Sequence, residues 1–351
     1  MTRNFLAPAL TGLLLLVGLV YWPGLSGPWL FDDFSNIRGN VFLRVTTLDW
    51  QSLGAAARSL EPGPLGRPVA YLSFALNHYL HGDASPYGWK LTNVAIHGLN
   101  ALLVAALLGL TLRRLAARGM LPARLVPALA FTVAALWALH PIQLSSVLYV
   151  VQRMTSLSGT FSLLALLCFL RARAALGSAN APAASRAGLW LAIAALFGVL
   201  GAYTKETAVL LPLYALLLDR TLYPDAPYWR RWLRLPAGLR LALAVAALGV
   251  VFGLAAWHYA PGYASRPFTL PERVLTQARV LWFYIGLVAL PRIDAFALHH
   301  DDIALSTGLL APWTTLPALL GVAGLGLLAW RCTDRRPLIG LGIAWFLAGH
   351  A

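Results

Sequence analysis

Long apolar segments alternate with short polar ones along almost the whole chain. Each apolar segment approaches the length that a helix needs to cross a hydrocarbon core of about 30 Å. The segments that fit this pattern are Phe5–Tyr21, Leu91–Leu112, Leu125–Leu139, Leu157–Leu170, Leu189–Tyr203, Ala208–Leu222, Leu241–Trp257, Leu316–Trp330 and Leu338–Ala348. The pattern predicts an all-α polytopic transmembrane protein with about nine membrane helices.

The composition supports a membrane protein and explains the basic character of the chain. Hydrophobic residues make up 59% and charged residues 11% of the 351 positions, and the net charge is +14. These proportions exclude an ordinary soluble domain. Basic residues cluster in alternate loops, and by the positive-inside rule these loops mark the inner side. The clusters are Arg3; Arg113, Arg114, Arg118 and Arg124; Arg171, Arg173 and Arg186; Arg220, Arg230, Arg231, Arg234 and Arg240; and Arg331, Arg335 and Arg336. The positive charge therefore indicates the orientation of the protein in the membrane and gives no reason to expect that it binds a nucleic acid.

Two long loops lie on the predicted outer side, at residues 22–90 and 258–312. Each contains an amphipathic stretch, Arg67–His81 in the first and Arg273–Leu290 in the second. We expect both stretches to form helices that lie in the membrane interface. If Arg273–Leu290 spanned the membrane, the basic cluster that follows the next helix would fall on the outer side, against the positive-inside rule.

A pair of adjacent carboxylates, Asp32 and Asp33, follows the first apolar segment in the run Gly27-Pro-Trp-Leu-Phe-Asp-Asp-Phe-Ser-Asn36. Ionised groups near a bilayer are costly and usually functional. Two neighbouring carboxylates also raise each other's pKa, which suits proton exchange. The alternative is a turn just outside a membrane helix, for which Asp, Ser and Asn are common residues.

Three further places on the predicted outer face combine charge or imidazole with apolar surroundings. Lys205, one of two lysines in the chain, is followed by Glu206, and the two form either part of a site or a mutually neutralised pair. Arg153 is a cation well suited to a phosphate, or an interfacial side chain that snorkels. His140 precedes Pro141 and is either a cap or a catalytic residue.

Other polar residues on this face are weaker candidates. They are Arg67, Asn77, Asn93, His97, Gln143, Arg279, His300 and Asp301. The run His299–Asp302 contains ordinary metal ligands, but adjacent residues rarely converge on one ion, so a solvated loop is the simpler interpretation. We expect no resident metal or cofactor. Cys168 and Cys332 do not form a disulfide framework, and no Gly-rich nucleotide loop is present.

Several of these pieces, in this order, resemble the membrane region of TMTC-type protein O-mannosyltransferases, and of that family's bacterial relatives. They are Phe31-Asp-Asp-Phe34; Arg67-Pro with Leu72-Ser-Phe and Asn77; Tyr87, Asn93, His97 and Asn100; His140-Pro-Ile with Val151-Gln-Arg153; and Thr204-Lys-Glu206. The ordered set covers most of the chain. The bacterial relatives often carry C-terminal tetratricopeptide repeats.

The resemblance implies a glycosyltransferase of the GT-C fold, which takes a sugar from a polyprenyl or dolichyl phosphate, usually with inversion. The acceptor is a protein or glycan hydroxyl on the outer face. In related enzymes an acid in the first outer loop is the general base, which falls here on Asp33 or Asp32. We favour Asp33, with Asp32 as its orienting neighbour. The donor phosphate would be held by Arg153, Lys205, Arg67 and Arg279.

Two departures from the family pattern stand out. Ser145 replaces the Glu of the family's His-Pro-Ile-x-x-Glu motif, and the chain ends at Gly349-His350-Ala351, before the further helices and repeats of the family. We therefore expect a single GT-C-like membrane domain over residues 1–351 that is incomplete at its C-terminus. The bacterial resemblance places it in the inner membrane with its site facing the periplasm.

The main alternative is a transporter or flippase for a lipid-linked sugar, which also needs cations for phosphate. Transporters usually place charged residues near the bilayer midplane on broken helices. Here the polar residues gather at one predicted face, so the sequence favours an enzyme.

Overall fold

The computed structural model describes residues 3–60, 66–176, 183–236, 238–240, 242–243, 246, 249, 253, 260–263, 265–297, 300 and 302–350. Most of the predicted span Leu241–Trp257 lies outside these residues, as do His299 and Asp301. Contacts within the chain divide it into two compact units, Met1–Ala215 and Leu216–Ala351.

The described residues are helical, as the sequence predicts, and the only strand-like feature among them is an isolated bridge between Gly308 and Ala311. Four of their helices are long and apolar enough to cross a membrane: Tyr87–Ala117, Val150–Leu176, Ser185–Ala202 and Thr315–Arg335. A pair bent by 53°, Ala123–Leu139 with Pro141–Leu148, makes a fifth if it forms one span. Pro8–Gly24 and Pro337–Ala348 are shorter apolar helices. An all-α membrane protein is thus confirmed.

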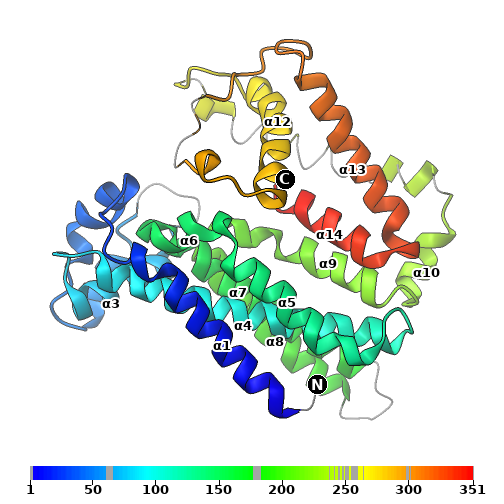
Figure 1. Cartoon of the computed structure of the whole chain (residues 1–351), viewed down its shortest axis with the longest axis horizontal. Helices are drawn as coiled ribbons and strands as arrows, with labels where there is room; N and C mark the ends of the chain where they lie inside the picture. The colour runs from blue at the N-terminus through cyan, green and yellow to red at the C-terminus, as the bar shows by residue number, and fades with distance from the viewer. Residues whose placement is uncertain are drawn as a thin grey trace. The chain divides into compact units, whose positions relative to one another are not determined.

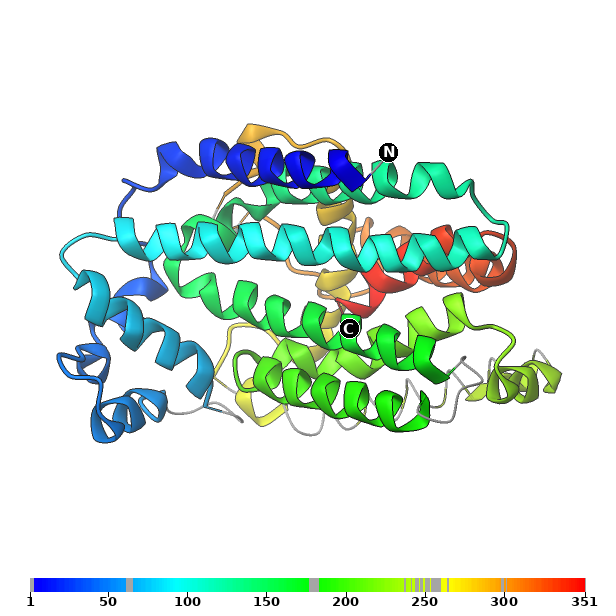
Figure 2. The same cartoon turned by 90° about the horizontal axis from the view of Figure 1, so that it is seen from below.

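The first unit is built around five helices that run side by side in both views (Figures 1 and 2): α1 (Arg3–Tyr21), α4 (Tyr87–Ala117), α5 (Val126–Leu139), α7 (Arg153–Leu176) and α8 (Ala183–Ala202). Helix α4 packs against α1, α5 and α7, and α7 packs against α8. The short elements α6 (Leu144–Leu148) and η6 (Val150–Gln152) join α5 to α7.

The helices of the first unit run so that the first long loop lies at one end of the bundle and the basic clusters lie at the other end. Helices α4 and α7 begin, and α5 and α8 end, at the same end of the bundle, beside the first long loop (Figure 2). The basic clusters after α4 and α7 lie at the other end. The charge separation that the positive-inside rule requires is therefore built into the unit.

The first long loop folds into short helices beside that end of the bundle. They are η1 (Trp22–Gly24), the π-helix η2 (Phe34–Arg38), η3 (Val41–Leu43), α2 (Trp50–Ala57) and α3 (Pro68–His81). Asp49 caps α2 by accepting from the Ser52 amide, and Pro68 stands in the first turn of α3, where its missing N–H costs nothing. The expected helix at Arg67–His81 is thus present.

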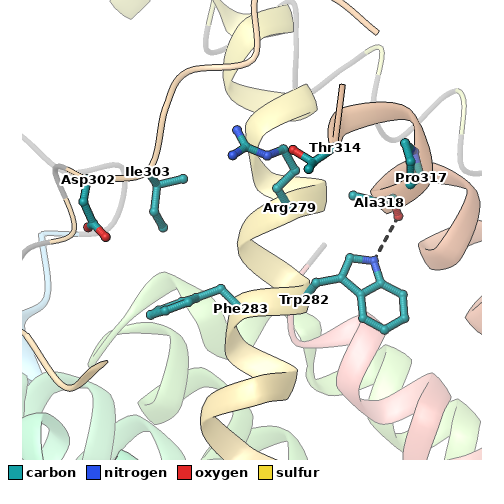
Figure 3. Close-up of a pocket in the computed structure, with 8 residues that line it drawn as sticks. All are labelled: Arg279, Trp282, Phe283, Asp302, Ile303, Thr314, Pro317 and Ala318. Carbon is teal, nitrogen blue, oxygen red and sulfur yellow. Dashed lines mark hydrogen bonds between the residues drawn. The ribbon is translucent and has the colours of Figure 1, made fainter. Parts of the chain in front are cut away.

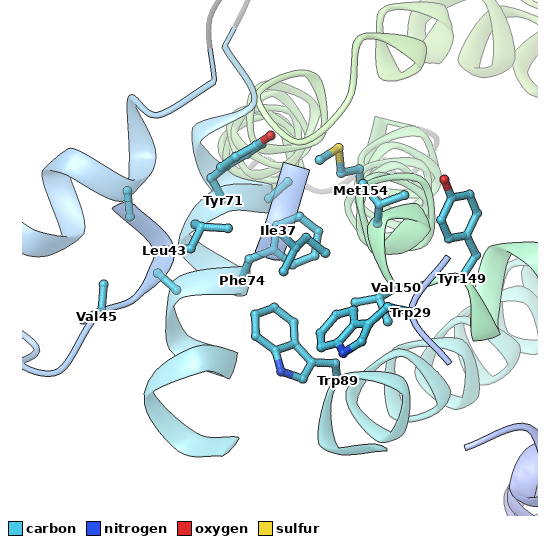
Figure 4. Packing of buried hydrophobic residues seen from close by; sticks show 14 residues of the cluster. Trp29, Ile37, Leu43, Val45, Tyr71, Phe74, Trp89, Tyr149, Val150 and Met154 are labelled. Carbon is cyan, nitrogen blue, oxygen red and sulfur yellow. The ribbon is translucent and has the colours of Figure 1, made fainter. Parts of the chain in front are cut away.

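An aromatic core holds this loop on the bundle (Figure 4). Trp89 of α4 is fully buried and stacks edge-on with Trp29 of the loop, with ring centroids 5.5 Å apart. Phe74 of α3 lies beside Trp89 at 6.2 Å, and Tyr149 closes the cluster. Because aromatic residues bury large areas, this core fixes the loop that carries the acid pair.

The second unit contains α10 (Pro227–Arg234), η8 (Ala260–Tyr263), α12 (Leu270–Ala289), η9 (Ile293–Ala295), α13 (Thr315–Arg335) and α14 (Pro337–Ala348); α9 (Leu211–Leu222), preceded by η7 (Glu206–Leu210), leads into it. The predicted span Ala208–Leu222 is thus a 3-10 turn followed by a shorter helix. Helix α12 begins with a capping box between Thr269 and Glu272, and it coincides with the second predicted interfacial stretch.

Helices α13 and α14 pack closely where Gly340 faces α13. A Cβ at Gly340 would lie 3.0 Å from the Thr333 amide nitrogen and 3.1 Å from the Ala329 carbonyl oxygen, whereas a Cβ at Gly342 meets nothing within 4 Å. We expect Gly340→Ala to lower the apparent stability by about 1–3 kcal/mol, because backbone cannot move aside as a side chain can. Thermal unfolding in detergent, followed by tryptophan fluorescence, measures this. Gly342→Ala is the control, and equal melting temperatures for both variants would contradict the expectation.

Candidate functional site

Asp33 is fully buried, and its carboxylate holds the first loop in place through hydrogen bonds. Its Oδ1 accepts from the Val151 amide at 2.7 Å and its Oδ2 from the Leu30 amide at 3.0 Å. Burial raises the pKa of the carboxyl, and the hydrogen bonds and the charge of Lys90 pull it partly back. Oδ1 thus ties the loop to the segment that leads into α7, and Oδ2 closes a turn within the loop, so that both oxygens are occupied and Asp33 is poorly placed to meet a substrate.

Asp32 is exposed, beside this buried neighbour. Its amide donates to the Tyr149 hydroxyl at 2.8 Å, and its carbonyl accepts from the Asn36 side chain at 3.1 Å. Burial and the charges of Asp32 and Asp33 raise the pKa of Tyr149. The protonated phenol thus holds the Asp32 backbone, and the exposed carboxylate is left open to an acceptor.

Arg153 is fully enclosed, and its guanidinium is occupied by the protein itself. Nε donates to Asn93 Oδ1 at 2.7 Å, Nη2 to Asn77 Oδ1 and to the Trp89 carbonyl, and Nη1 to the Ser73 carbonyl at 3.1 Å. The cation also faces the Trp89 ring at 5.6 Å. The predicted phosphate role for Arg153 is not supported, because the side chain has no exposed surface. Asn77 and Asn93 are its hydrogen-bond acceptors.

Arg67 and Glu206 form a partly exposed ion pair. Arg67 Nε lies 3.0 Å from Glu206 Oε1, and Nη2 lies 2.9 Å from Oε2. Burial opposes the Glu206 charge, but the bonds from Arg67 outweigh it and lower the carboxyl pKa. Glu206 therefore pairs directly with Arg67, 139 positions away, and the charge of the adjacent Lys205 makes a smaller contribution.

Lys205 points its ammonium at α7, where Nζ donates to Thr155 Oγ1 at 2.6 Å. Thr155 in turn donates to Gln152 Oε1 at 2.7 Å, and Gln152 follows Tyr149 by one turn. Burial and the charge of Arg67 lower the Lys205 pKa. Lys205 is half-buried and, with Arg67, supplies partly exposed positive charge at the end of the bundle that carries Asp32.

The predicted histidines of the first unit have structural surroundings. His97 is buried, its Nε2 lies 2.8 Å from the Ala138 carbonyl oxygen, and its ring meets Tyr21 edge-on. His140 Nδ1 accepts from the Ile142 amide at 3.1 Å, which is the capping alternative drawn from the sequence. Gln143 lies beside it, half-buried in the turn after α5.

Arg279 and His300 belong to the second unit. Arg279 lines a pocket between α12 and α13, and His300 packs its ring on Phe283 with centroids 4.8 Å apart. His300 Nδ1 lies 3.7 Å from Asp302. Asp301 lies outside the described residues, and within those residues no group of three His, Cys, Asp or Glu side chains is arranged as metal ligands.

Sequence reasoning assigned no role to three polar residues of this region: Tyr149, which contacts Asp32, and Gln152 and Thr155, which are linked by hydrogen bonds to Lys205. It also missed Asn36 and Tyr71, which are joined by a 3.0 Å hydrogen bond from the Tyr71 hydroxyl. Tyr149 and Gln152 stand inside the His140–Arg153 stretch that the sequence singled out. Their polarity within an apolar run was the available signal.

Arg153→Gln should lower the apparent free energy of unfolding by about 3–5 kcal/mol, because buried acceptors then lose a charged partner. Arg38→Gln is the control, since the Arg38 side chain is exposed on η2 and lies over the Phe34 ring. Urea unfolding in detergent measures both. Unchanged stability of Arg153→Gln would restore a ligand-binding role for this residue.

Asp33 should make the protein less stable as the pH rises. Burial raises its folded-state pKa above 3.8, so above that pH the unfolded chain ionises while the folded chain resists. The stability difference between wild type and Asp33→Asn should therefore shrink upward from about pH 4. Asp49, whose pKa is lowered by a hydrogen bond from Thr47, should show the opposite slope in Asp49→Asn. Melting temperatures from pH 3.5 to 7 test both signs, and a difference for Asp33→Asn that grows with pH would refute the assignment.

Comparison with known proteins shows that about half of the chain is similar to protein O-mannosyl-transferases. The chain is 27% identical over 193 residues to human protein O-mannosyl-transferase TMTC4, covering 52% of this chain and 25% of the relative. It is 25% identical over 190 residues to mouse TMTC4, covering 52% and 25%, and 30% identical over 183 residues to Drosophila protein O-mannosyl-transferase Tmtc3, covering 48% and 19%. No family model and no solved structure matches the chain. The chain thus spans a quarter or less of the length of these relatives, and the resemblance drawn from its motifs is confirmed as a distant similarity.

Proposed function

We propose that this protein is a membrane glycosyltransferase that moves a hexose from a polyprenyl-phosphate donor to a protein or glycan hydroxyl at the periplasmic face. The observation that carries the proposal is the exposed Asp32 carboxylate, whose backbone is held by Tyr149 at the end of the bundle that also holds Arg67 and Lys205. The names of the similar proteins, O-mannosyl-transferases, support a transferase and suggest mannose.

The proposed reaction is a single displacement at the anomeric carbon. The Asp32 carboxylate accepts the proton of the acceptor hydroxyl as its oxygen bonds to the anomeric carbon. The bond from that carbon to the phosphate oxygen breaks, and the electron pair leaves with the polyprenyl phosphate. Such a displacement inverts the configuration of the sugar.

Asp32 takes the base role in place of Asp33, which the sequence had favoured. A base must reach its substrate, and Asp33 has no exposed surface and two occupied oxygens, whereas Asp32 is exposed. Asp33 acts as a positioning residue, because it holds the loop that presents its neighbour.

Lys205 and Arg67 stabilise the charge on the departing phosphate in this proposal. The Lys205 ammonium has three N–H donors, and its bond to Thr155 uses one of them. About three-tenths of the Arg67 side chain is exposed beside Glu206. Preorganised cations in a partly dry site stabilise a leaving phosphate more than they would in water. We also propose that the membrane domain is of GT-C type and that the full set of about nine apolar segments spans the bilayer.

Asp32→Asn should reduce transfer by about 10²–10⁴-fold while leaving the melting temperature unchanged, since a general base contributes that much and Asp32 is exposed. The assay reconstitutes the purified chain in nanodiscs with radiolabelled mannosyl polyprenyl phosphate and a Ser/Thr-rich peptide, and counts labelled peptide. A glucosyl donor run in parallel tests the sugar.

Asp83→Asn is the matched control, because Asp83 belongs to the same loop and pairs instead with Arg44 at 3.7 Å. Asp33→Asn should lose both transfer and stability. If Asp32→Asn transfers sugar at the wild-type rate, Asp32 is not the general base. If the wild-type protein transfers no sugar but moves the labelled donor across the membrane of a vesicle, the protein is a flippase.

A further inference from the structure

Helix α10 (Pro227–Arg234) in the second unit has a basic side and an aromatic side. Because an α-helix has about 3.6 residues per turn, Arg230, Arg231 and Arg234 share one side of it. The opposite side carries Tyr228, Trp229, Trp232 and Leu233. A basic amphipathic helix of this kind is typical of one that lies in the plane of a membrane surface.

A buried carboxylate holds α10 against the end of α9. Asp219 is 5% exposed, and its Oδ2 accepts from the Trp229 indole at 2.8 Å and from the Tyr228 hydroxyl. The Arg220 guanidinium lies over the Trp229 ring, 5.9 Å from its centroid. The aromatic side of α10 is therefore turned toward α9, and its three arginines are exposed.

A further contact places α10 at the end of a candidate membrane span. Arg220 also pairs with Asp334, so that α9 and the span Thr315–Arg335 end beside each other, with α10 next to them (Figure 1). The end of a spanning helix lies at the boundary between hydrocarbon and water, where Trp and Tyr are enriched. Helix α10 thus lies at the depth that suits its aromatic side chains.

The exposed side chains around α10 are mostly basic. The exposed arginines at this end of the second unit are Arg230, Arg231, Arg234, Arg331, Arg335 and Arg336. The Arg230–Asp225 pair is 3.8 Å long with side chains 64% and 80% exposed, and such pairs are weak. Arg231 and Arg234 form no ion pair within the described part of the chain. This surface therefore attracts a partner of negative charge.

We propose that α10 is an interfacial helix that docks on an anionic phospholipid surface, on the membrane side that the basic clusters mark. Its three arginines contact the lipid phosphates, and Trp232 lies at the level of the head groups. A soluble acidic partner would use the arginines but would not explain the aromatic side chains at the end of a span. The proposal does not rest on the proposed transfer reaction.

This surface is distinct from the pocket between α12 and α13. Figure 3 shows that pocket, whose lining includes Arg279, Trp282 and Phe283 and no residue of α10. Binding at α10 can therefore be changed without touching Arg279, the residue of this unit that was predicted to hold the donor phosphate.

The test follows amide hydrogen exchange of α10 in the whole chain, in nanodiscs of phosphatidylcholine with or without phosphatidylglycerol. We expect the wild-type α10 amides to exchange at least threefold more slowly with phosphatidylglycerol, because docking suppresses local opening. Each arginine contributes about fivefold to binding an anionic surface, so removal of three weakens it on the order of 10²-fold. The triple variant Arg230→Gln, Arg231→Gln, Arg234→Gln should therefore lose the difference between the two lipids.

The matched control removes the same charge elsewhere in the second unit. Arg266, Arg273 and Arg292 are exposed and lie outside α10, and their triple substitution by Gln should leave the lipid difference at α10 unchanged. Replacing the three α10 arginines by Lys keeps the charge and should keep the difference. Melting temperatures show whether each variant is folded.

Three results would overturn the proposal. The first is equal exchange of the wild-type α10 amides in both lipids, which needs no variant. The second is loss of the lipid difference in the control variant as well, which would make it an effect of total charge. The third is protection of α10 in phosphatidylcholine by an added single-stranded oligonucleotide as strong as that by phosphatidylglycerol, which would make α10 a site for soluble polyanions.

Discussion

The burial of one guanidinium, that of Arg153, constrains the end of the first unit that carries the first long loop. A cation without exposed surface must find acceptors, and Arg153, at the start of α7, finds them on two other helices: Asn77 and the Ser73 carbonyl of α3, and Asn93 and the Trp89 carbonyl of α4. Removing any one partner leaves a buried polar group unpaired. The loop helix α3 is thereby fixed to two membrane helices, and the acid pair is carried by the loop that packs against them.

Asp32 and Asp33 have different roles because the chain buries one of them and leaves the other exposed. Asp33 enters the aromatic core and accepts from the Val151 amide, two positions before Arg153, so the buried carboxylate and the buried guanidinium stabilise the same junction. Asp32 is left outside, held through its backbone and by Tyr149. From the sequence, the proximity of like charges suggested that each acid raises the pKa of the other and that one of them is poised for proton exchange. The structure instead separates the pair by burial, and only one carboxylate faces solvent.

The sequence predicted the helices well and the pairing of polar residues poorly. Apolar runs located α4 and α13, His140 marked the end of α5, and the amphipathic stretch in the first loop became α3. Local patterns suffice for these features because each depends on its own neighbours. Arg67 with Glu206, and Lys205 with Thr155, join positions far apart in the chain, and no local pattern contains that information. The burial of Arg153 likewise depends on tertiary packing. The local sequence around a buried arginine does not distinguish it from an arginine that snorkels to the membrane interface.

Backbone strain gives a separate reason to place function at this end of the first unit. Among the described residues that are not glycine, positive φ occurs at Phe31, with φ of 29°, and at Arg67, with φ of 50°. A left-handed conformation costs such residues about 1–3 kcal/mol, and it persists only where the surroundings impose it. Phe31 immediately precedes Asp32, and Arg67 is one of the two partly exposed cations. Substitution by glycine would relieve the strain at either position, yet the chain keeps a phenylalanine and an arginine. The strain thus lies at Arg67 and at the residue that precedes Asp32, the two places where the proposed reaction needs a side chain held in position.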